Sequence, residues 1–328
     1  MNPIISVIVP VFNSENTLAE CLGNLLNQTY ENIEVILVDD ASTDNSCVVM
    51  EAAKEQFPEK VIILKQEKNK GPGAARNLGL SHAGGEYIGF VDSDDRVDPA
   101  MYEKLYTLIT ENEADIADCA FYKESDDSAS LHFSKELCGE LNDSKRSDLI
   151  AAGGYAVTKL YRKDFLLDNG IVYREDYILE DMDLMMLMIA KAAKVAGTEE
   201  VLYIYRDRAS SQSKEMDPAK YIMACCNAMV AIYERLSPLK GYTRIREAAE
   251  YGMASLYSNA VNLCLMKYKS APEVYLSMLE TLRQLARKCI FLPLGRNKYI
   301  RRKMDKQDLK VIEANSKDPR TLLAKVGF

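Results

Sequence analysis

Four aspartates fall within seven positions in the stretch FVDSDDRVDP, residues 90–99, directly after the apolar run YIGFV. Carboxylates this close repel one another, so such a cluster persists most easily where a cation or a cationic partner neutralises it. Carboxylate oxygens suit the hard ions Mg²⁺ and Mn²⁺, which keep coordination sites for substrate oxygens. The pair Asp92 and Asp94 therefore predicts a divalent metal held against a diphosphate.

Two other kinds of acidic site fit this stretch less well. An EF-hand loop starting at Asp92 would put Arg96 and Val97 where an oxygen ligand and the turn glycine are needed, and a strand precedes it. A phosphatase with an aspartyl nucleophile also carries two such acids after a strand. Its usual context is absent here, because Asp95 and Arg96 follow and no matching lysine motif is present. The phosphatase stays open as an alternative.

The elements around this cluster alternate in the first hundred or so residues between short Val- and Ile-rich runs and helical patterns. This alternation indicates a parallel sheet wrapped by helices. The expected strands are residues 4–10, 33–39, 61–65 and 87–92. The expected helices are 18–26 and 44–57, with two more that begin near Pro72 and Pro99.

Polar residues follow three of these strands, at Pro10 to Asn13, at Asp39 and Asp40, and at Asp92 to Asp95. Ligands of such sheets bind outside the carboxyl ends of the strands. The three polar clusters should therefore converge on one crevice.

The regular alternation fades after Glu111. The later patterns predict a strand at 115–123, a hairpin tip or loop at 124–130, helices at 157–170 and 178–194, and a strand at 201–208. From Pro218 onward the pattern is helical, with long segments at 221–236, 245–268 and 272–289. These patterns predict an α/β domain followed by a helical region, with a boundary near Met216.

The segment GPGAARNLG differs from the dinucleotide fingerprint, because Arg76 stands where a glycine is needed and the segment follows the third apolar run. A nicotinamide cofactor is therefore not expected. Gly71 and Gly73 would let backbone approach a ligand, and Arg76 would pair with phosphate or with the acidic cluster. A helix start with a core salt bridge remains the structural alternative.

The formal net charge of −8 over 328 residues argues against nucleic acid as the main partner. The charge is uneven, because residues 287–328 carry twelve Lys or Arg against four Asp or Glu, which is 12 − 4 = +8. This tail is either a solvated helical face or a surface attracted to anionic membranes.

Eight scattered cysteines without a CxxC pair indicate reduced cytoplasmic thiols, and the two histidines are too isolated for a metal site. The N-terminus lacks the basic region of a signal peptide, and no uncharged run reaches spanning length. We therefore expect a cytoplasmic protein, with peripheral contact at the inner membrane face as a further option.

Five stretches together resemble family 2 glycosyltransferases of the GT-A fold over roughly residues 4–213. They are SVIVPVFNSENTLAECLGNLLNQTYENIEVILVDDASTDNS, GPGAARNLGL, GEYIGFVDSDD, KLYRKDFL and LEDMDL. The resemblance implies a Rossmann-like mixed sheet flanked by helices. It also implies an enzyme of the type that synthesises bacterial polysaccharides and glycans. It implies a catalytic domain over 1–215, with a nucleotide-binding half at 1–112 and an acceptor half at 113–215. Residues 216–328 would form a C-terminal helical extension.

The resemblance also implies roles for single residues. Pro10, Phe12 and Asn13 would line the nucleotide pocket, Asp40 would accept from the base N–H, and Asp39 would support it. Arg76 would lie along the nucleotide, with Ser93 in the same donor-binding stretch. Asp92 would face the ribose and the metal, and Asp94 would ligate Mn²⁺ or Mg²⁺. Glu180 and Asp181 fall at the catalytic base of inverting members; otherwise Asp181 is an acid that favours a helix N-terminus.

The implied reaction moves one sugar from a nucleotide-diphosphate donor, with uridine diphosphate favoured by the resemblance, to a glycan or lipid-linked acceptor hydroxyl. Arg206 or Arg208 would assist at the diphosphate. The chain has no tryptophan, so the QxxRW signature of processive synthases is absent and single-sugar transfer is expected. The alternative is a non-catalytic nucleotide-sugar binder or assembly protein on the same fold. A homo-oligomer stays open.

Overall fold

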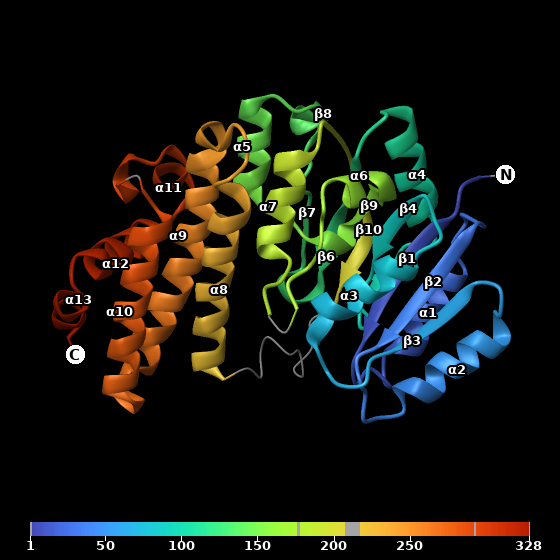
Figure 1. Ribbon diagram of the computed structural model, residues 1–328, viewed down its shortest axis with the longest axis horizontal. Helices are drawn as coiled ribbons and strands as arrows, with labels where there is room; N and C mark the ends of the chain where they lie inside the picture. Colours follow the sequence, from blue (N-terminus) through green and yellow to red (C-terminus); the bar gives the residue numbers. More distant parts are fainter. Residues whose placement is uncertain (1, 176–177, 207–216, 292, 328) are drawn as a thin grey trace. The chain divides into compact units, whose positions relative to one another are not determined.

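The Val- and Ile-rich runs form the centre of one mixed sheet in the computed structural model, which describes residues 2–175, 178–206, 217–291 and 293–327. The strand order is β3-β2-β1-β4-β9-β6-β10-β5, with β7 paired to β6 and β8 to β10 (Figure 1). The strands are β1 Ile5–Val11, β2 Ile33–Asp39, β3 Val61–Lys65, β4 Tyr87–Phe90, β5 Arg96–Val97, β6 Ile116–Lys123, β7 Ser128–Ser130, β8 Gly139–Glu140, β9 Lys159–Arg162 and β10 Lys194–Tyr205. Strands β1 to β4 pair in parallel, whereas β9 runs antiparallel to β4 and β6.

Helices cover both faces of this sheet. They are α1 Leu18–Leu26, α2 Ser46–Gln56, α3 Gly71–His82, α4 Met101–Glu111 and α6 Lys163–Asp168. Most of α5 Asp143–Ala152 and of α7 Met182–Lys191 belongs to the second unit. Gly79 of α3 lies against Ile8, and Gly89 of β4 lies against Tyr102 of α4. Ile8 pairs with Phe90, the residue next to Gly89, so these two contacts lie on opposite faces because side chains alternate along a strand. The α/β prediction is confirmed.

Two details of the second half differ from the sequence-based expectation. Residues 159–162, expected to be helical, form β9 between β4 and β6. Leu160 and Tyr161 are both fully buried, so this strand lacks the polar alternation that marks a strand with one wet face. Strand β10 begins at Lys194 and contains an irregular register between Thr198 and Tyr203, which explains why only its second part was predicted. The stretch 124–130 is the hairpin tip between β6 and β7.

The chain divides into two compact units, which we describe separately. The first comprises residues 1–145, 154–184 and 191–209, and holds the whole sheet. The second comprises residues 146–153, 185–190 and 210–328. The boundary expected at residues 215 and 216 lies outside the described residues.

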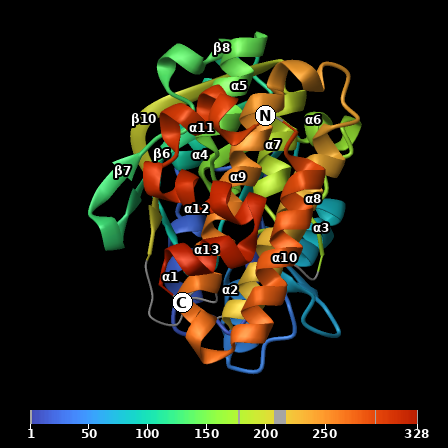
Figure 2. The same cartoon turned by 90° about the vertical axis from the view of Figure 1, so that its left-hand side faces the viewer.

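The second unit is helical, as the sequence predicts. Its helices are α8 Pro218–Leu236, α9 Tyr242–Lys267, α10 Pro272–Cys289, α11 Lys298–Lys303, α12 Lys306–Lys317 and α13 Pro319–Lys325. Helices α8 and α10 both pack against α9, which buries a continuous row of residues along its length (Figure 2). In the described part of the chain, no helix is both long enough and apolar enough to cross a bilayer.

Candidate active site

The acidic loop after β4 is anchored by its last member, Asp95. Asp95 is 2% exposed and accepts from the Tyr203 hydroxyl at 2.5 Å and from the Arg206 backbone N–H at 2.9 Å. Burial, together with the charges of Asp92 and Asp94, raises the pKa of Asp95 to about 8. Asp95 therefore ties the acidic loop to β10, a role that its sequence context did not distinguish from those of its neighbours.

Arg76 of α3 joins the acidic loop (residues 92–95) to the LEDMD segment (residues 179–183). Its guanidinium donates to Asp92 Oδ1 at 2.7 Å and to Glu180 Oε1 at 2.5 Å, and it lies 5.2 Å from the centre of the Tyr173 ring. The arginine is 6% exposed. The sequence suggested that Arg76 pairs with phosphate or with the acidic cluster. In the structure it pairs with the acidic residues Asp92 and Glu180. Residues more than a hundred positions apart thereby form one cluster, which we call the Arg76 cluster (Arg76, Asp92, Glu180 and Asp181).

Asp181 is the carboxyl of this cluster whose pKa departs clearly from its usual range. Burial, then the neighbouring Glu180 carboxylate, raises the pKa of Asp181 to about 7, while the Arg76 charge opposes the rise. Asp92 adds to the increase. A carboxyl that titrates near neutrality is matched to taking up a proton during a reaction.

Arg174, which the sequence did not single out, holds the LEDMD segment in place. Its side chain donates to the Leu179 carbonyl oxygen and to Asp183 Oδ1, both at 2.7 Å. Leu179 has a φ of 59°, which is uncommon for a branched residue and needs such support. A Cβ at Gly73 would lie 2.2 Å from the Arg174 carbonyl oxygen, so α3 approaches closely only because this position is glycine. In the sequence, this contact was signalled by Gly73, the second glycine of GPG.

Asp39 and Asp40 both accept hydrogen bonds from nearby loops. Asp40 accepts from the backbone N–H groups of Lys70 at 2.7 Å and Gly71 at 2.8 Å, and from the Gln66 amide at 2.9 Å. Asp40 thus caps the start of α3, the helix that carries Arg76. Asp39 accepts from the Ser42 backbone N–H at 3.1 Å.

The other predicted donor residues lie at the same edge of the sheet. Pro10 pairs with Val38 inside the β1–β2 ladder. Asn13, with a φ of 50°, accepts from the Thr43 backbone N–H at 2.8 Å, which joins the ends of β1 and β2. The hydroxyl of Ser93 lies 2.7 Å from that of Ser14, which directly follows the predicted set Pro10, Phe12 and Asn13. The expected convergence of the three strand ends is therefore observed.

A surface hollow of about 770 Å³ adjoins Asp40. Gln66 and Lys70, which both donate to Asp40, form part of its wall. The lining residues are Lys65, Gln66, Glu67, Lys68, Lys70, Ala74, Asn77, Leu78 and Glu175. Its mixed charges and polar groups suit a polar ligand more than an apolar one.

The acidic loop has donor atoms of the right kind for a hard divalent ion. Asp94 is partly buried beside Asp92 and Asp95, and the mutual repulsion that raises the pKa of Asp95 would be relieved by a cation. Across the described ranges, no three His, Cys, Asp or Glu side chains are already spaced as metal ligands. The residues therefore fit a metal that is completed by substrate oxygens better than one in a protein-only cage.

Comparison with known proteins assigns the family. The profile described as Glycosyl transferase family 2 matches residues 6–169, which is half of the chain. Glycosyltransferase GlyG of Streptococcus pneumoniae is 34% identical over 223 residues, 64% of this chain and 73% of that protein. The chain belongs to glycosyl transferase family 2. It is also 33% identical to the minor teichoic acid biosynthesis protein GgaA of Bacillus subtilis over 220 residues, but it spans 48% of that protein.

Solved structures confirm the GT-A fold of this family 2 glycosyltransferase. Residues 1–349 of S. aureus TarS, in complex with UDP-GlcNAc, align with a TM-score of 0.67 at 22% identity, covering 96% of this chain and 91% of that one. The mannosyltransferase PcManGT from Pyrobaculum calidifontis, in complex with GDP-Man and Mn²⁺, aligns with a TM-score of 0.58 at 18% identity, covering 99% and 86%. The likeness extends through the helical second unit.

The family match ends before the LEDMD segment of this family 2 glycosyltransferase. The role of Asp181 therefore rests on its place in the Arg76 cluster. The Arg206 side chain donates to Glu20 Oε2 at 2.6 Å, whereas Arg208 lies outside the described residues. The expected assistance of either arginine at a diphosphate stays a prediction.

Proposed function

We propose that this enzyme transfers one sugar from a nucleotide-diphosphate donor to an acceptor hydroxyl with inversion at the sugar carbon, and that it requires a divalent metal. The observation that carries this proposal is the Arg76 cluster. One guanidinium joins Asp92 of the acidic loop to Glu180, the residue next to Asp181. The predicted metal loop and the predicted base thereby belong to one site.

The donor would lie along the edge formed by the three strand ends. We place its nucleoside end near Asp40, beside the hollow that Gln66 and Lys70 line. Pro10, Phe12, Asn13, Asp39, Arg76, Asp92 and Ser93 would complete the donor site. The complexes of TarS with UDP-GlcNAc and of PcManGT with GDP-Man support a nucleotide-sugar donor. We favour a UDP-sugar because the TarS structures align with the higher TM-score.

Asp94, together with Asp92, would hold Mn²⁺ or Mg²⁺ through carboxylate oxygens. When bound, the ion stabilises the negative charge that grows on the leaving diphosphate. The PcManGT complex with Mn²⁺ supports a metal in this fold. Arg76 neutralises Asp92 and Glu180 from the side of α3, so the carboxylates are held in place for this task.

Asp181 would take the proton of the acceptor hydroxyl as the new glycosidic bond forms. Its raised pKa, about 7, means that it is largely ionised just above neutral pH and is a stronger base than an ordinary aspartate. Removal of a positioned base of this kind lowers rates by roughly 10²–10⁴-fold. A base across the sugar from the leaving group gives inversion.

The acceptor would be a glycan or a lipid-linked glycan of the cell surface. The relationship to the teichoic acid protein GgaA supports this assignment. We propose that the enzyme works in the cytoplasm and that a basic segment of the second unit contacts the inner membrane. The exposed basic side chains of this segment are Arg296, Lys298, Arg301, Arg302 and Lys303. Sedimentation with phosphatidylglycerol vesicles, but not with phosphatidylcholine vesicles, is expected and should be lost in Arg301→Glu/Arg302→Glu.

The donor site is tested by thermal shift with a panel of nucleotide sugars, with Mn²⁺ or with EDTA. We expect one donor to raise the melting temperature in Mn²⁺ only. Asp94→Ala should lose that metal-dependent rise, whereas Glu113→Gln, a change on the exposed end of a loop, should keep it. A donor that stabilises Asp94→Ala as well as the original protein would remove Asp94 from the site.

A further inference from the structure

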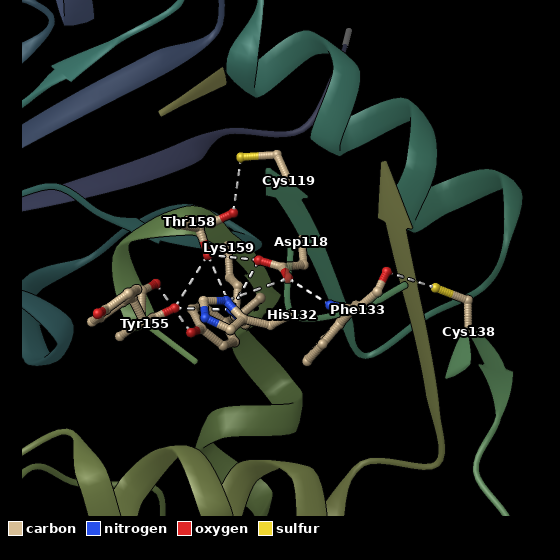
Figure 3. A network of polar contacts seen from close by, with 10 residues as sticks. Asp118, Cys119, His132, Phe133, Cys138, Tyr155, Thr158 and Lys159 are labelled. Carbon is tan, nitrogen blue, oxygen red and sulfur yellow. Dashed lines mark hydrogen bonds and ion pairs between the residues drawn. The ribbon is translucent and has the colours of Figure 1, made fainter. Parts of the chain in front are cut away.

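A fully buried ion pair lies in the first unit outside the Arg76 cluster. Lys159 at the start of β9 donates to Asp118 Oδ1 of β6 at 2.8 Å, and both side chains are 0% exposed (Figure 3). The Thr158 hydroxyl donates to the same oxygen at 2.6 Å, and the Phe133 backbone N–H donates to Asp118 Oδ2 at 3.1 Å. The pair is thus hydrogen-bonded on all sides and sealed from solvent.

Such a pair is a poor source of stability, because removing two charges from water costs about as much as their attraction returns. The pair does, however, fix a neighbouring residue. Lys159 Nζ also donates to the Tyr155 carbonyl oxygen at 2.9 Å. Gly154 has a φ of 144°, and a Cβ there would lie 3.3 Å from His132 and 3.4 Å from Lys159 Nζ. The backbone that carries Tyr155 is therefore held by a buried charge and a required glycine.

Tyr155 is exposed, at 44%, although its backbone is so firmly held. Its ring meets two others at steep angles, Phe121 at 5.1 Å and His132 at 5.4 Å between ring centres. Phe121 and His132 stack on each other at 5.4 Å. We call these three side chains the Tyr155 shelf. Figure 3 shows His132 and Tyr155 together beside Lys159 and Asp118.

The shelf is uncharged at physiological pH. Burial and the Lys159 charge lower the pKa of His132 to about 4, so its ring stays neutral. Lys159 is neutralised by Asp118 beneath the rings. The shelf therefore offers the exposed ring of Tyr155, backed by two largely buried rings, with no charge on these side chains for a phosphate group to pair with.

The shelf lies next to the acidic loop through the sheet. Phe121 pairs with Tyr203 in the β6–β10 ladder, and the Tyr203 hydroxyl is the group that holds Asp95. Burial, then the acids of this loop and, last, Tyr155 raise the pKa of Tyr205, two residues further along β10, to about 12. Phe121 of the shelf and Tyr203, which holds the acidic loop, are therefore direct neighbours on adjacent strands.

We propose that the Tyr155 shelf binds the acceptor through an uncharged pyranose ring, whose C–H face packs against the exposed ring of Tyr155. An exposed aromatic ring on a rigid support is suited to this contact, since it buries apolar area at little cost in side-chain entropy. The inference rests on the proposed transferase function and names the class of its second substrate.

The test uses ligand-observed saturation-transfer NMR on the full chain with three probes: methyl β-D-glucopyranoside, methyl β-D-galactopyranoside and methyl N-acetyl-β-D-glucosaminide. We expect at least one probe to bind the original protein and Tyr155→Phe. Tyr155→Ala should weaken that binding by on the order of tenfold. Tyr122→Ala, a change of a partly exposed tyrosine on β6, the strand that carries Phe121, is the matched control and should bind as the original protein does.

Two outcomes overturn the shelf: equal binding by Tyr155→Ala, or no binding of any of the three probes at tens of millimolar. Ribitol 5-phosphate serves as a fourth probe, and its binding in place of the glycosides would also reject a neutral ring as the ligand. Donor binding is measured on the same samples. A Tyr155→Ala protein that binds donor normally but not the glycosides supports the shelf. If the original protein itself binds no donor, the proposed donor site is rejected instead.

The positioning role of Lys159 is tested with the double variant Asp118→Leu/Lys159→Met, which removes both charges and keeps apolar bulk. We expect a folded protein, with a cooperative thermal transition, that binds the glycoside probes several-fold more weakly because Tyr155 has lost its anchor. If the double variant binds the glycoside probes as tightly as the original protein, the ion pair does not position Tyr155.

Discussion

Two groups of buried opposite charges in the first unit, the Asp118–Lys159 pair and the Arg76 cluster, are built differently. The Asp118–Lys159 pair is completely sealed, and nearly every oxygen and hydrogen has a partner within the fold. In the Arg76 cluster the arginine is buried, but Asp92 keeps a third of its side chain exposed. A sealed pair can only hold structure in place, whereas an accessible cluster of acids can exchange protons and meet ligands.

The acidity of the two groups follows the same division. Asp181, whose neighbours are mostly acids, has a pKa raised to about 7. Beside the sealed pair, burial and the Lys159 charge lower the pKa of His132 to about 4, which keeps its ring neutral. This difference supports the proposals that the Arg76 cluster takes up a proton and that the Asp118–Lys159 pair supports the fold.

Removing the base should have the largest effect. Asp181→Asn keeps the shape of the side chain but cannot take the acceptor proton, so we expect transfer to fall by roughly 10²–10⁴-fold. Donor affinity should change little. The measurement is steady-state transfer beside donor titration, with the exposed Glu113→Gln as control. Retention of more than a tenth of the activity would place the base elsewhere.

Breaking the sealed pair should chiefly affect folding. Lys159→Met leaves Asp118 buried without its countercharge and should destabilise the protein by about 3–5 kcal/mol. Asp118→Leu/Lys159→Met should recover most of that loss. Urea unfolding of both variants measures this difference. A single variant as stable as the double variant would contradict the view that Asp118 is charged in its buried site.

The pH dependence of transfer should report Asp181. The deprotonated form is the base, so the rate should rise with pH through about 7 and level off above it, and it should be lost as pH falls below the raised pKa. Profiles of kcat at saturating donor and metal measure this midpoint. A rate that stays constant down to pH 5 would show that no group with such a pKa is required.

The smallest change is expected at the support of the LEDMD segment. Arg174→Lys keeps the charge beside Asp183 but cannot donate at once to Asp183 and to the Leu179 carbonyl. We expect kcat to fall by about tenfold or less, with the pH midpoint shifted and donor affinity unchanged. An unaltered pH profile would reduce Arg174 to a purely structural residue.

The sequence predicted the parts that depend on local pattern. The apolar runs at β1 to β4, the helix that begins near Pro72 and the polar strand ends all follow from periodicity and from the rule for parallel sheets. Strand β9 was predicted as helix, because a strand buried on both faces has no alternation. Arg174 and Tyr155 were missed for another reason. Their importance comes from contacts with residues that are close only after folding, such as Gly73 for Arg174 and His132 for Tyr155.

The central claim is that the acidic loop and Asp181 form one site, with the leaving diphosphate at the loop and the base across the sugar. The most direct test is proton NMR of the anomeric centre during transfer from an α-linked nucleotide sugar that the donor panel identifies. This arrangement predicts a β-linked product from the first turnover. An α-linked product would contradict it, because retention cannot arise from a single displacement assisted by Asp181.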